Sequence, residues 1–119
     1  MSEIGLEKLL LLNGSKLGSL LDARVRPDMS FPVTLSLSLT DKCNMKCLWC
    51  CDLDFRDNHQ GWLDVKVIDS MFEQAAKGGT TGVTVEGGGE PTIHPKFPEI
   101  VASGKKHGLR LGLFTNGLH

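Results

Sequence analysis

The sequence has no apolar segment long enough to cross a membrane. Its aliphatic run at residues 9–12 is four leucines, whereas a membrane-spanning helix needs about 20 apolar residues. The N-terminal residues also lack the basic segment and the longer apolar run of a secretory signal peptide. Neither membrane insertion nor secretion is therefore expected, and we predict a cytoplasmic protein.

The sequence also lacks a large charge of either sign. The formal net charge is -1, which gives no long-range attraction to nucleic acid or to an anionic membrane. The 119 residues, of which 40% are hydrophobic, fit one small domain with a buried core. Internal repeats and low-complexity tracts are absent as well. We predict no nucleic-acid partner and no membrane partner.

Cysteine is missing from all but one short stretch. Cys43, Cys47, Cys50 and Cys51 fall within nine residues, whereas a disulfide framework spreads its cysteines to close loops. In a reducing compartment, clustered thiols more often bind a metal or perform redox chemistry. The C-x3-C-x2-C spacing lets three thiolates reach one soft metal centre, and no second cysteine pair exists to complete a zinc site. Cys51, adjacent to Cys50, is predicted to be a bystander.

Hydrophobic patterning predicts alternating strands and helices. Apolar residues alternate with serine and threonine in the first strand, while the first helix begins at Asp64 and stops at Gly78-Gly79. The expected elements are strands at 33–40, 82–86 and 109–114 and helices at 64–78 and 96–107. Helical connections of this length imply parallel strands joined by right-handed crossovers. Loops at the carboxyl ends of the three strands are therefore expected to lie at one edge of the sheet.

The loop after the first strand carries a family resemblance. Residues 39–50, Leu-Thr-Asp-Lys-Cys-Asn-Met-Lys-Cys-Leu-Trp-Cys, resemble the signature loop of the radical SAM superfamily, C-x3-C-x-aromatic-C. The resemblance implies that Cys43, Cys47 and Cys50 hold a 4Fe–4S cluster with one open iron. It also implies that Trp49 lies against the adenine of S-adenosylmethionine. The reduced cluster would cleave this cofactor to a 5′-deoxyadenosyl radical that abstracts hydrogen from a substrate.

Two further segments support the same resemblance. The triple-glycine segment at residues 87–92 is similar to the Gly-Gly-Glu-Pro motif of that family, which lines the methionine amino group of the cofactor. Gly88, Gly89 and Glu90 would make this contact, largely through backbone carbonyls, with a positional role for the Glu90 side chain. A phosphate-binding loop would need Lys-Ser/Thr after the glycines. Thr115 and Asn116 resemble the third-strand ending near the cofactor.

The resemblance implies the first three β/α units of a partial (β/α)6, TIM-like barrel with a parallel sheet. Residues 33–119 would be the N-terminal part of a radical SAM domain, and residues 1–32, with a helix at 3–12, an N-terminal extension. A full eight-unit barrel needs about 250 residues, so the chain is interpreted as truncated. Its open sheet edge could support self-association.

Several partners follow from the same reading. An electron donor such as flavodoxin or ferredoxin would reduce the cluster, and the cluster loop points to a peptide or protein substrate. The alternative to a radical SAM enzyme is a non-catalytic α/β module that binds zinc or an iron–sulfur cluster. The histidines are interpreted as solvated: His59, His94, His107 and His119. The loop charges that follow the cysteines would either face a substrate or, as is usual for a charged loop, be solvated: Asp52, Asp54, Arg56 and Asp57.

Overall fold

The computed structural model describes residues 32–54 and 61–118. The strands are β1 (Thr34–Ser38), β2 (Gly82–Glu86) and β3 (Arg110–Leu113), and the helices are α3 (Val65–Lys77), the 3-10 turn η1 (Pro91–Ile93) and α4 (Phe97–Lys106). The predicted helix at 3–12 and the predicted extension, apart from residue 32, lie outside the described residues. No helix in the described ranges is long and apolar enough to cross a membrane.

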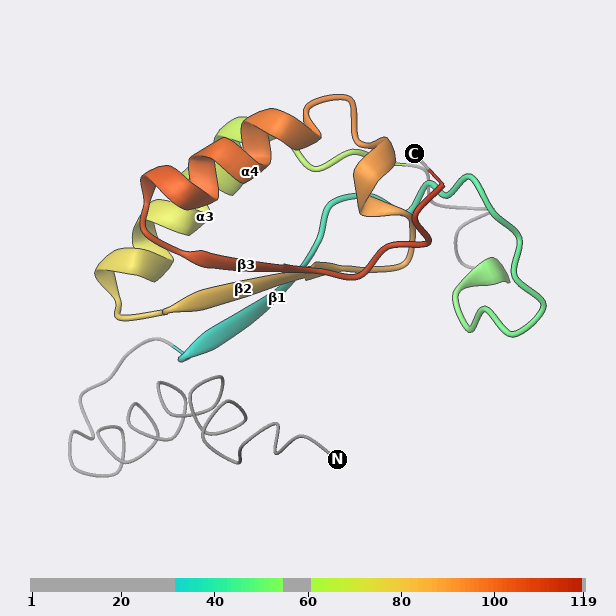
Figure 1. The fold of residues 1–119 in the computed structure, drawn as a ribbon, viewed down its shortest axis with the longest axis horizontal. Helices are drawn as coiled ribbons and strands as arrows, with labels where there is room; N and C mark the ends of the chain where they lie inside the picture. The colour runs from blue at the N-terminus through green and yellow to red at the C-terminus, as the bar shows by residue number, and fades with distance from the viewer. Residues whose placement is uncertain (1–31, 55–60, 119) are drawn as a thin grey trace, which may run out of the picture.

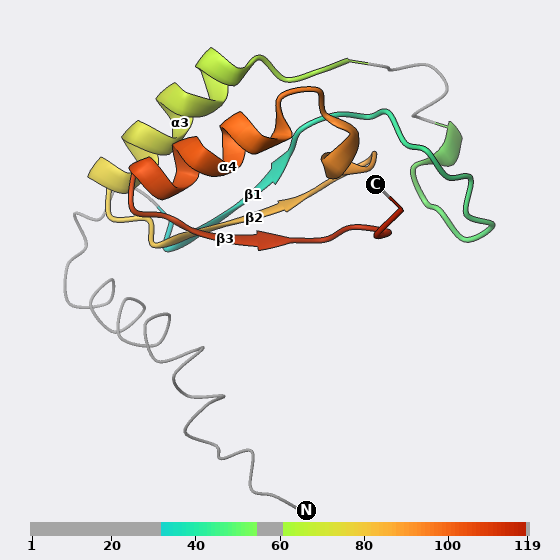
Figure 2. The same ribbon diagram turned by 45° about the horizontal axis from the view of Figure 1, so that its top comes forward.

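The three strands form one parallel sheet in the order β1-β2-β3. Both α3 and α4 cover the same face of this sheet, and no described element covers the other face (Figures 1 and 2). This arrangement follows from the period-2 pattern, because Leu37, Val83 and Val85 are buried under the helices. Ser36 and Ser38 point the other way and are exposed. The predicted α/β fold with a parallel sheet is confirmed.

Helix α3 has the start and stop signals that the sequence predicts. The Asp64 carboxylate accepts a hydrogen bond from the Lys66 N–H at 2.7 Å, which satisfies one of the free donors at the helix N-terminus. At the other end, Gly78 donates its N–H to the Gln74 carbonyl at 2.9 Å. The helix buries three side chains: Ile68, Phe72 and Ala75. Full burial of a side chain such as Ile68 or Phe72 contributes about 1.5–3 kcal/mol to stability.

Helix α4 packs closely on β3 and is joined to α3 by polar contacts. A Cβ at Gly104 would lie 2.7 Å from a Leu111 methyl carbon, so glycine here gives the Leu111 side chain room to pack against the helix. The Asp69 carboxylate of α3 accepts hydrogen bonds from the Ser103 hydroxyl at 2.5 Å and from His107 Nε2 at 3.0 Å. These two hydrogen bonds hold the pKa of Asp69 below its usual value. The prediction that His107 is merely solvated is therefore wrong.

The first strand ends earlier than the alternating pattern predicts. After Ser38 the chain turns toward residues 61–63, and Leu39 accepts a hydrogen bond from the Leu63 N–H at 2.9 Å. Thr40 forms an isolated antiparallel bridge with Trp62, and its hydroxyl donates to the Gly61 carbonyl at 2.7 Å. Thr40 is consequently buried and does not continue the hydroxyl-bearing face of the strand.

Candidate cofactor-binding site at the carboxyl edge of the sheet

Three loops meet at the edge where the parallel strands end. We call them the cysteine loop (residues 41–52, after β1), the glycine loop (residues 87–90, after β2) and the third-strand turn (residues 114–117, after β3). All three lie at the same end of the molecule, beyond the strand tips (Figure 1). The sequence predicts this meeting, because parallel strands send their carboxyl ends to one edge.

Backbone hydrogen bonds attach the glycine loop to the base of the cysteine loop. Gly89 donates its N–H to the Thr40 carbonyl at 3.1 Å, and Glu90 donates to the Lys42 carbonyl at 2.8 Å. A Cβ at Gly89 would overlap the Lys42 carbonyl oxygen and lie 2.7 Å from that of Thr40. Gly87 has a φ of +144°, and a Cβ there would overlap the Ser38 side chain. Glycine at these two positions lets the backbones approach closely.

The Glu90 side chain is a buried acceptor of four hydrogen bonds. Its Oε1 accepts from the Thr92 N–H at 3.0 Å, the Thr92 hydroxyl at 2.6 Å and the Thr115 hydroxyl at 2.7 Å. Its Oε2 accepts from the Asn116 N–H at 2.8 Å. Burial raises the pKa of Glu90, but these hydrogen bonds outweigh it and hold the pKa below the usual value. The carboxylate therefore joins η1 to the third-strand turn and is not poised as a general base.

An open hollow of about 630 Å³ lies between the loops. Its wall consists of residues 86–90, residues 114–116 and Asp52. Five of the six residues predicted to contact the cofactor lie here: Gly88, Gly89, Glu90, Thr115 and Asn116. The sequence analysis missed Glu86, although strand alternation places it on the uncovered sheet face, and it missed Phe114. Asp52, one of the loop charges that follow the cysteines, also lines the hollow.

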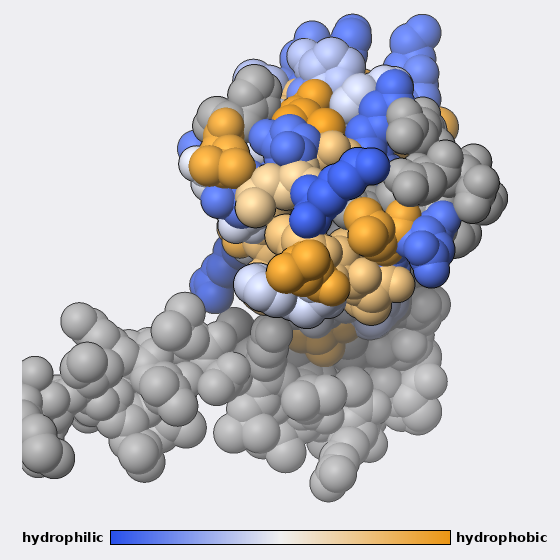
Figure 3. All heavy atoms as spheres, turned by 90° about the vertical axis from the view of Figure 1, so that its right-hand side faces the viewer, coloured by the Kyte–Doolittle hydropathy of each residue, from blue (hydrophilic) through white to orange (hydrophobic). Residues whose placement is uncertain are grey.

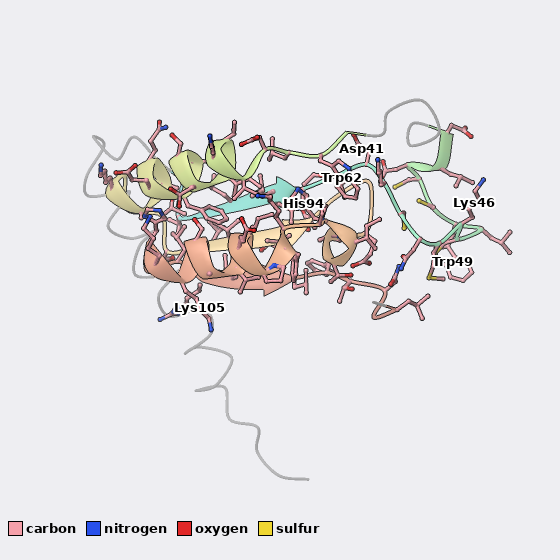
Figure 4. The ribbon with its side chains drawn as sticks, turned by 90° about the horizontal axis from the view of Figure 1, so that it is seen from above. Asp41, Lys46, Trp49, Trp62, His94 and Lys105 are labelled. Atoms are coloured by element: carbon pink, nitrogen blue, oxygen red, sulfur yellow. The ribbon has the colours of Figure 1, made fainter. Side chains whose placement is uncertain are left out.

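Trp49, the sixth predicted contact, does not line the hollow. Its side chain is 85% exposed and that of the neighbouring Leu48 is 96% exposed. Trp49 and Lys46 lie on the cysteine loop, well away from the sheet (Figure 4). Viewed from this end, the molecule carries apolar side chains between charged ones (Figure 3). The third-strand end also contributes exposed apolar residues here, Phe114 and Leu118.

The three predicted metal ligands are free thiols on one loop. Cys43, Cys47 and Cys50 are partly buried, while Cys51 is exposed and its thiol lies 3.6 Å from an Asp52 carboxylate oxygen. A turn forms between Cys47 and Cys50, whose N–H donates to the Cys47 carbonyl at 3.1 Å. Cysteine thiolates are the usual ligands of iron–sulfur clusters, so these three free thiols are candidate ligands. Within the two described ranges, however, no three Cys, His, Asp or Glu side chains gather into a metal-binding group.

One side-chain hydrogen bond crosses from the cysteine loop to the third-strand turn. The Asn116 amide donates to the Asn44 side-chain oxygen at 2.8 Å on the surface of the molecule. Asn116 also accepts from the Leu118 N–H at 3.0 Å. Asn116 thus contacts both other loops, with its backbone on Glu90 of the glycine loop and its side chain on Asn44 of the cysteine loop.

Comparison with known proteins identifies a family and relatives that match most of the chain. A family model described as the Radical SAM superfamily matches residues 37–119. The chain is 36% identical over 84 residues to the tungsten-containing aldehyde ferredoxin oxidoreductase cofactor-modifying protein of Pyrococcus furiosus, covering 70% of the chain and 23% of the relative. It is 35% identical over 96 residues to GTP 3′,8-cyclase 1 of Mycobacterium tuberculosis, covering 71% and 25%. The chain thus spans about a quarter of the length of these relatives.

Proposed function

The chain belongs to the radical SAM superfamily, and from this membership we propose that it binds a 4Fe–4S cluster and S-adenosylmethionine at the carboxyl edge of its sheet. The observation that carries the proposal is the hollow of about 630 Å³. The glycine loop and the third-strand turn form most of its wall, and the adjoining cysteine loop carries three free cysteines at the proposed ligand positions. Small-molecule sites typically have volumes of about 300–1,000 Å³, so the hollow is of suitable size for a nucleoside cofactor.

Cys43, Cys47 and Cys50 would hold the cluster as thiolates. Three protein ligands leave one of the four irons of a cubane without a protein ligand, and the cofactor can bind there. When bound, the cluster and cofactor supply a 5′-deoxyadenosyl radical by one-electron cleavage of the sulfonium bond, for hydrogen abstraction from a substrate. An electron donor such as flavodoxin or ferredoxin would reduce the cluster.

The wall of the hollow suits the charged end of S-adenosylmethionine. Glu86 and Asp52 are the carboxylates of this wall besides Glu90, and negative side chains attract a positively charged amino or sulfonium group. Glu90 would act indirectly, because its carboxylate already accepts hydrogen bonds from residues of the chain. Its role is to hold Thr115 and Asn116 at the rim. Trp49 offers an exposed aromatic face to the adenine ring.

The substrate is a separate question from the cofactor. The names of the two relatives point to different substrates, a tungsten-containing enzyme's cofactor and GTP. The family model matches residues 37–119, which include the cysteine loop and the glycine loop, so the family match supports the proposed cofactor and is silent on the substrate. The predicted peptide or protein substrate stays a prediction.

Anaerobic reconstitution with iron and sulfide tests the proposed cluster. We expect about four irons and four sulfides per chain, as a cubane requires. Replacing Cys43, Cys47 or Cys50 with alanine should abolish this loading. Cys51→Ala is the matched control, because it removes an exposed thiol from the same loop and should leave the iron content unchanged. Loss of iron in Cys51→Ala alone, or stoichiometric zinc in place of iron, would contradict the proposal and favour a non-catalytic metal-binding module.

The cofactor is tested on the same reconstituted chain. Saturating S-adenosylmethionine should change the electron paramagnetic resonance signal of the dithionite-reduced cluster, because it would ligate the open iron. Trp49→Ala should weaken this change while leaving the iron content intact. A spectrum unaffected by the cofactor would contradict the proposed binding at the open iron.

A further inference from the structure

A buried histidine lies just after the glycine loop and η1, and the proposed function gives it no role. His94 follows η1 directly and is 4% exposed, so the prediction that it is solvated is wrong. Its Nδ1 accepts a hydrogen bond from the Lys96 N–H at 3.2 Å. The proton of the neutral ring is therefore on Nε2, which donates to the Leu63 carbonyl at 3.0 Å. Both ring nitrogens are thus used, one locally and one across to a distant segment.

His94 also supports the aromatic ring next to that segment. The rings of Trp62 and His94 meet edge to face, with centroids 5.2 Å apart and planes at 85°, a favourable aromatic geometry. The Lys42 ammonium lies 4.6 Å from the centre of the Trp62 ring, within the range of a cation–π interaction. Trp62 and His94 lie side by side near Asp41, at the start of the cysteine loop (Figure 4).

These contacts close a circuit between the two loops. Lys42 immediately precedes Cys43, its N–H donates to the Thr40 hydroxyl at 3.0 Å, and its carbonyl accepts from the Glu90 N–H at 2.8 Å. Glu90 in turn lies four residues before His94. The path from Glu90 through His94, Trp62 and Lys42 therefore returns to Glu90. Its members come from three separate parts of the chain, so no local segment could hold this geometry alone.

We propose that His94 and Trp62 form a bracket that holds the base of the cysteine loop against the glycine loop and thereby positions Cys43 beside the cofactor hollow. His94 is a positioning residue in this proposal and touches neither cluster nor cofactor. The role of the bracket in positioning Cys43 rests on the proposed cluster binding. The bracket itself rests only on the contacts at Lys42, Trp62 and Leu63.

Two substitutions distinguish the hydrogen bond from His94 to the distant Leu63 carbonyl from the local hydrogen bond between His94 and Lys96. In His94→Gln the amide nitrogen reaches the position of Nε2, so the hydrogen bond to the Leu63 carbonyl is kept while the local acceptor for Lys96 is lost. In His94→Asn the side-chain oxygen takes the position of Nδ1, so the local hydrogen bond is kept while the reach to Leu63 is lost. If the bracket holds the two loops together, His94→Gln should keep the cysteine loop against the glycine loop, whereas His94→Asn should loosen it.

Amide hydrogen exchange of the metal-free chain is the first readout. The Gly89 and Glu90 amides donate to carbonyls at the base of the cysteine loop, and their exchange is compared with that of core amides in β2. In His94→Asn we expect their exchange relative to β2 to rise about tenfold, as for the loss of one buried hydrogen bond. His94→Gln should resemble the wild type. His107→Asn, which removes the Nε2 hydrogen bond to Asp69 between α3 and α4, is the matched control and should leave the ratio unchanged.

Three results would overturn the bracket: a wild-type ratio in His94→Asn, an equal rise in both variants, or a rise confined to His94→Gln. Electron paramagnetic resonance of the reconstituted, reduced chain is the second readout, and the signal should change in His94→Asn and be retained in His94→Gln. If the wild type loads no iron, the proposed function fails, whereas the exchange ratios still decide the bracket. If iron loads and the ratios do not move, the bracket alone fails.

Discussion

The glycine loop and the cysteine loop share one edge of the sheet but are built differently. The glycine loop ends in Glu90, which is 3% exposed. Its backbone is hydrogen-bonded to Lys42 and Ile93, and its side chain accepts four hydrogen bonds. The cysteine loop carries Leu48 and Trp49, which are 96% and 85% exposed. It is held at its base by Thr40 and Lys42 and at its side by Asn44. The protein's own contacts hold the first loop in place, whereas the second carries the three cysteines that are proposed to bind a cluster.

This difference has a physical reason. Metal-ligating thiols must lose their protons and converge, and a fully preformed site of this kind is uncommon in the absence of metal. The glycine loop has no such requirement, because it uses backbone groups and one carboxylate that the chain itself satisfies. We therefore expect substitutions in the glycine loop to reduce the stability of the metal-free chain, and substitutions in the outer cysteine loop to alter metal loading only.

Gly89→Ala should give the largest loss of stability. The new Cβ would overlap the Lys42 carbonyl, and backbone atoms cannot move aside as a side chain can. We expect the free energy of unfolding of the metal-free chain to fall by about 3 kcal/mol or more, measured by urea denaturation. Gly88→Ala is the control, because its Cβ would meet the side chains of Asp41 at 3.2 Å and Asp52 at 3.9 Å rather than backbone, and it should cost less than about 1 kcal/mol. Equal losses in the two variants would contradict the close backbone contact.

Glu90→Gln should cost about 2 kcal/mol at neutral pH, because the amide cannot accept from the Asn116 N–H in the same pose. The loss should also depend on pH. The pKa of Glu90 is held below its usual value of 4.5, so the ionised carboxylate stabilises the fold above about pH 4.5. This stabilisation disappears as the pH falls through the folded-state pKa.

The difference in unfolding free energy between wild type and Glu90→Gln, measured from pH 7 down to pH 3, should therefore shrink at the acidic end. Taking the difference removes the contributions of Asp69 and Glu73, whose pKa values are also lowered. Glu99→Gln on the exposed face of α4 should show no such difference. A gap that is constant over this range would mean that Glu90 is not held ionised by its hydrogen bonds.

The link between Asn44 and Asn116 should contribute less. It is an exposed side-chain hydrogen bond, and Asn116 makes a second one to the Leu118 N–H, so single substitutions mix the two. A double-mutant cycle with Asn44→Ala and Asn116→Ala isolates the link between the loops. We expect a coupling energy of about 0.5 kcal/mol in the metal-free chain. A coupling energy near zero would mean that this hydrogen bond does not stabilise the cysteine loop. The difference in stability between the two loops would then be larger than described.

Leu48→Ser should have the smallest effect. The side chain is almost fully exposed, so its replacement should change the free energy of unfolding of the metal-free chain by less than about 0.5 kcal/mol. Thermal or urea denaturation measures this directly. A substantial loss would show that the outer cysteine loop packs against the rest of the chain before any metal binds.

Much of the fold could be predicted from the sequence because its signals are local. The predicted helix at 64–78 and α3 differ by one residue at each end, since Asp64 and Gly78-Gly79 supply explicit start and stop chemistry. The strand at 82–86 matches β2. The first strand is two residues shorter than predicted at its carboxyl end, because Thr40 bonds to Gly61 and bridges Trp62. No periodic pattern reports such a long-range contact.

The site could be predicted to a similar extent, and for the same reason. Motifs placed at the ends of parallel strands must lie at one edge, and five predicted residues do line the hollow. The burial of His94 was not predictable, because it depends on a segment that is far away in the sequence. A histidine after a short turn looks solvated until residues 61–63 pack over it.

The most direct test of the contrast is amide hydrogen exchange of the same chain before and after anaerobic reconstitution with iron and sulfide. The glycine-loop amides of Gly89 and Glu90 should be protected in both states. The amides of residues 43–50 should exchange readily without metal and become at least about tenfold slower once iron is bound. A cysteine loop that is already as protected as the glycine loop in the metal-free chain, or that gains no protection with a full complement of iron, would contradict the account.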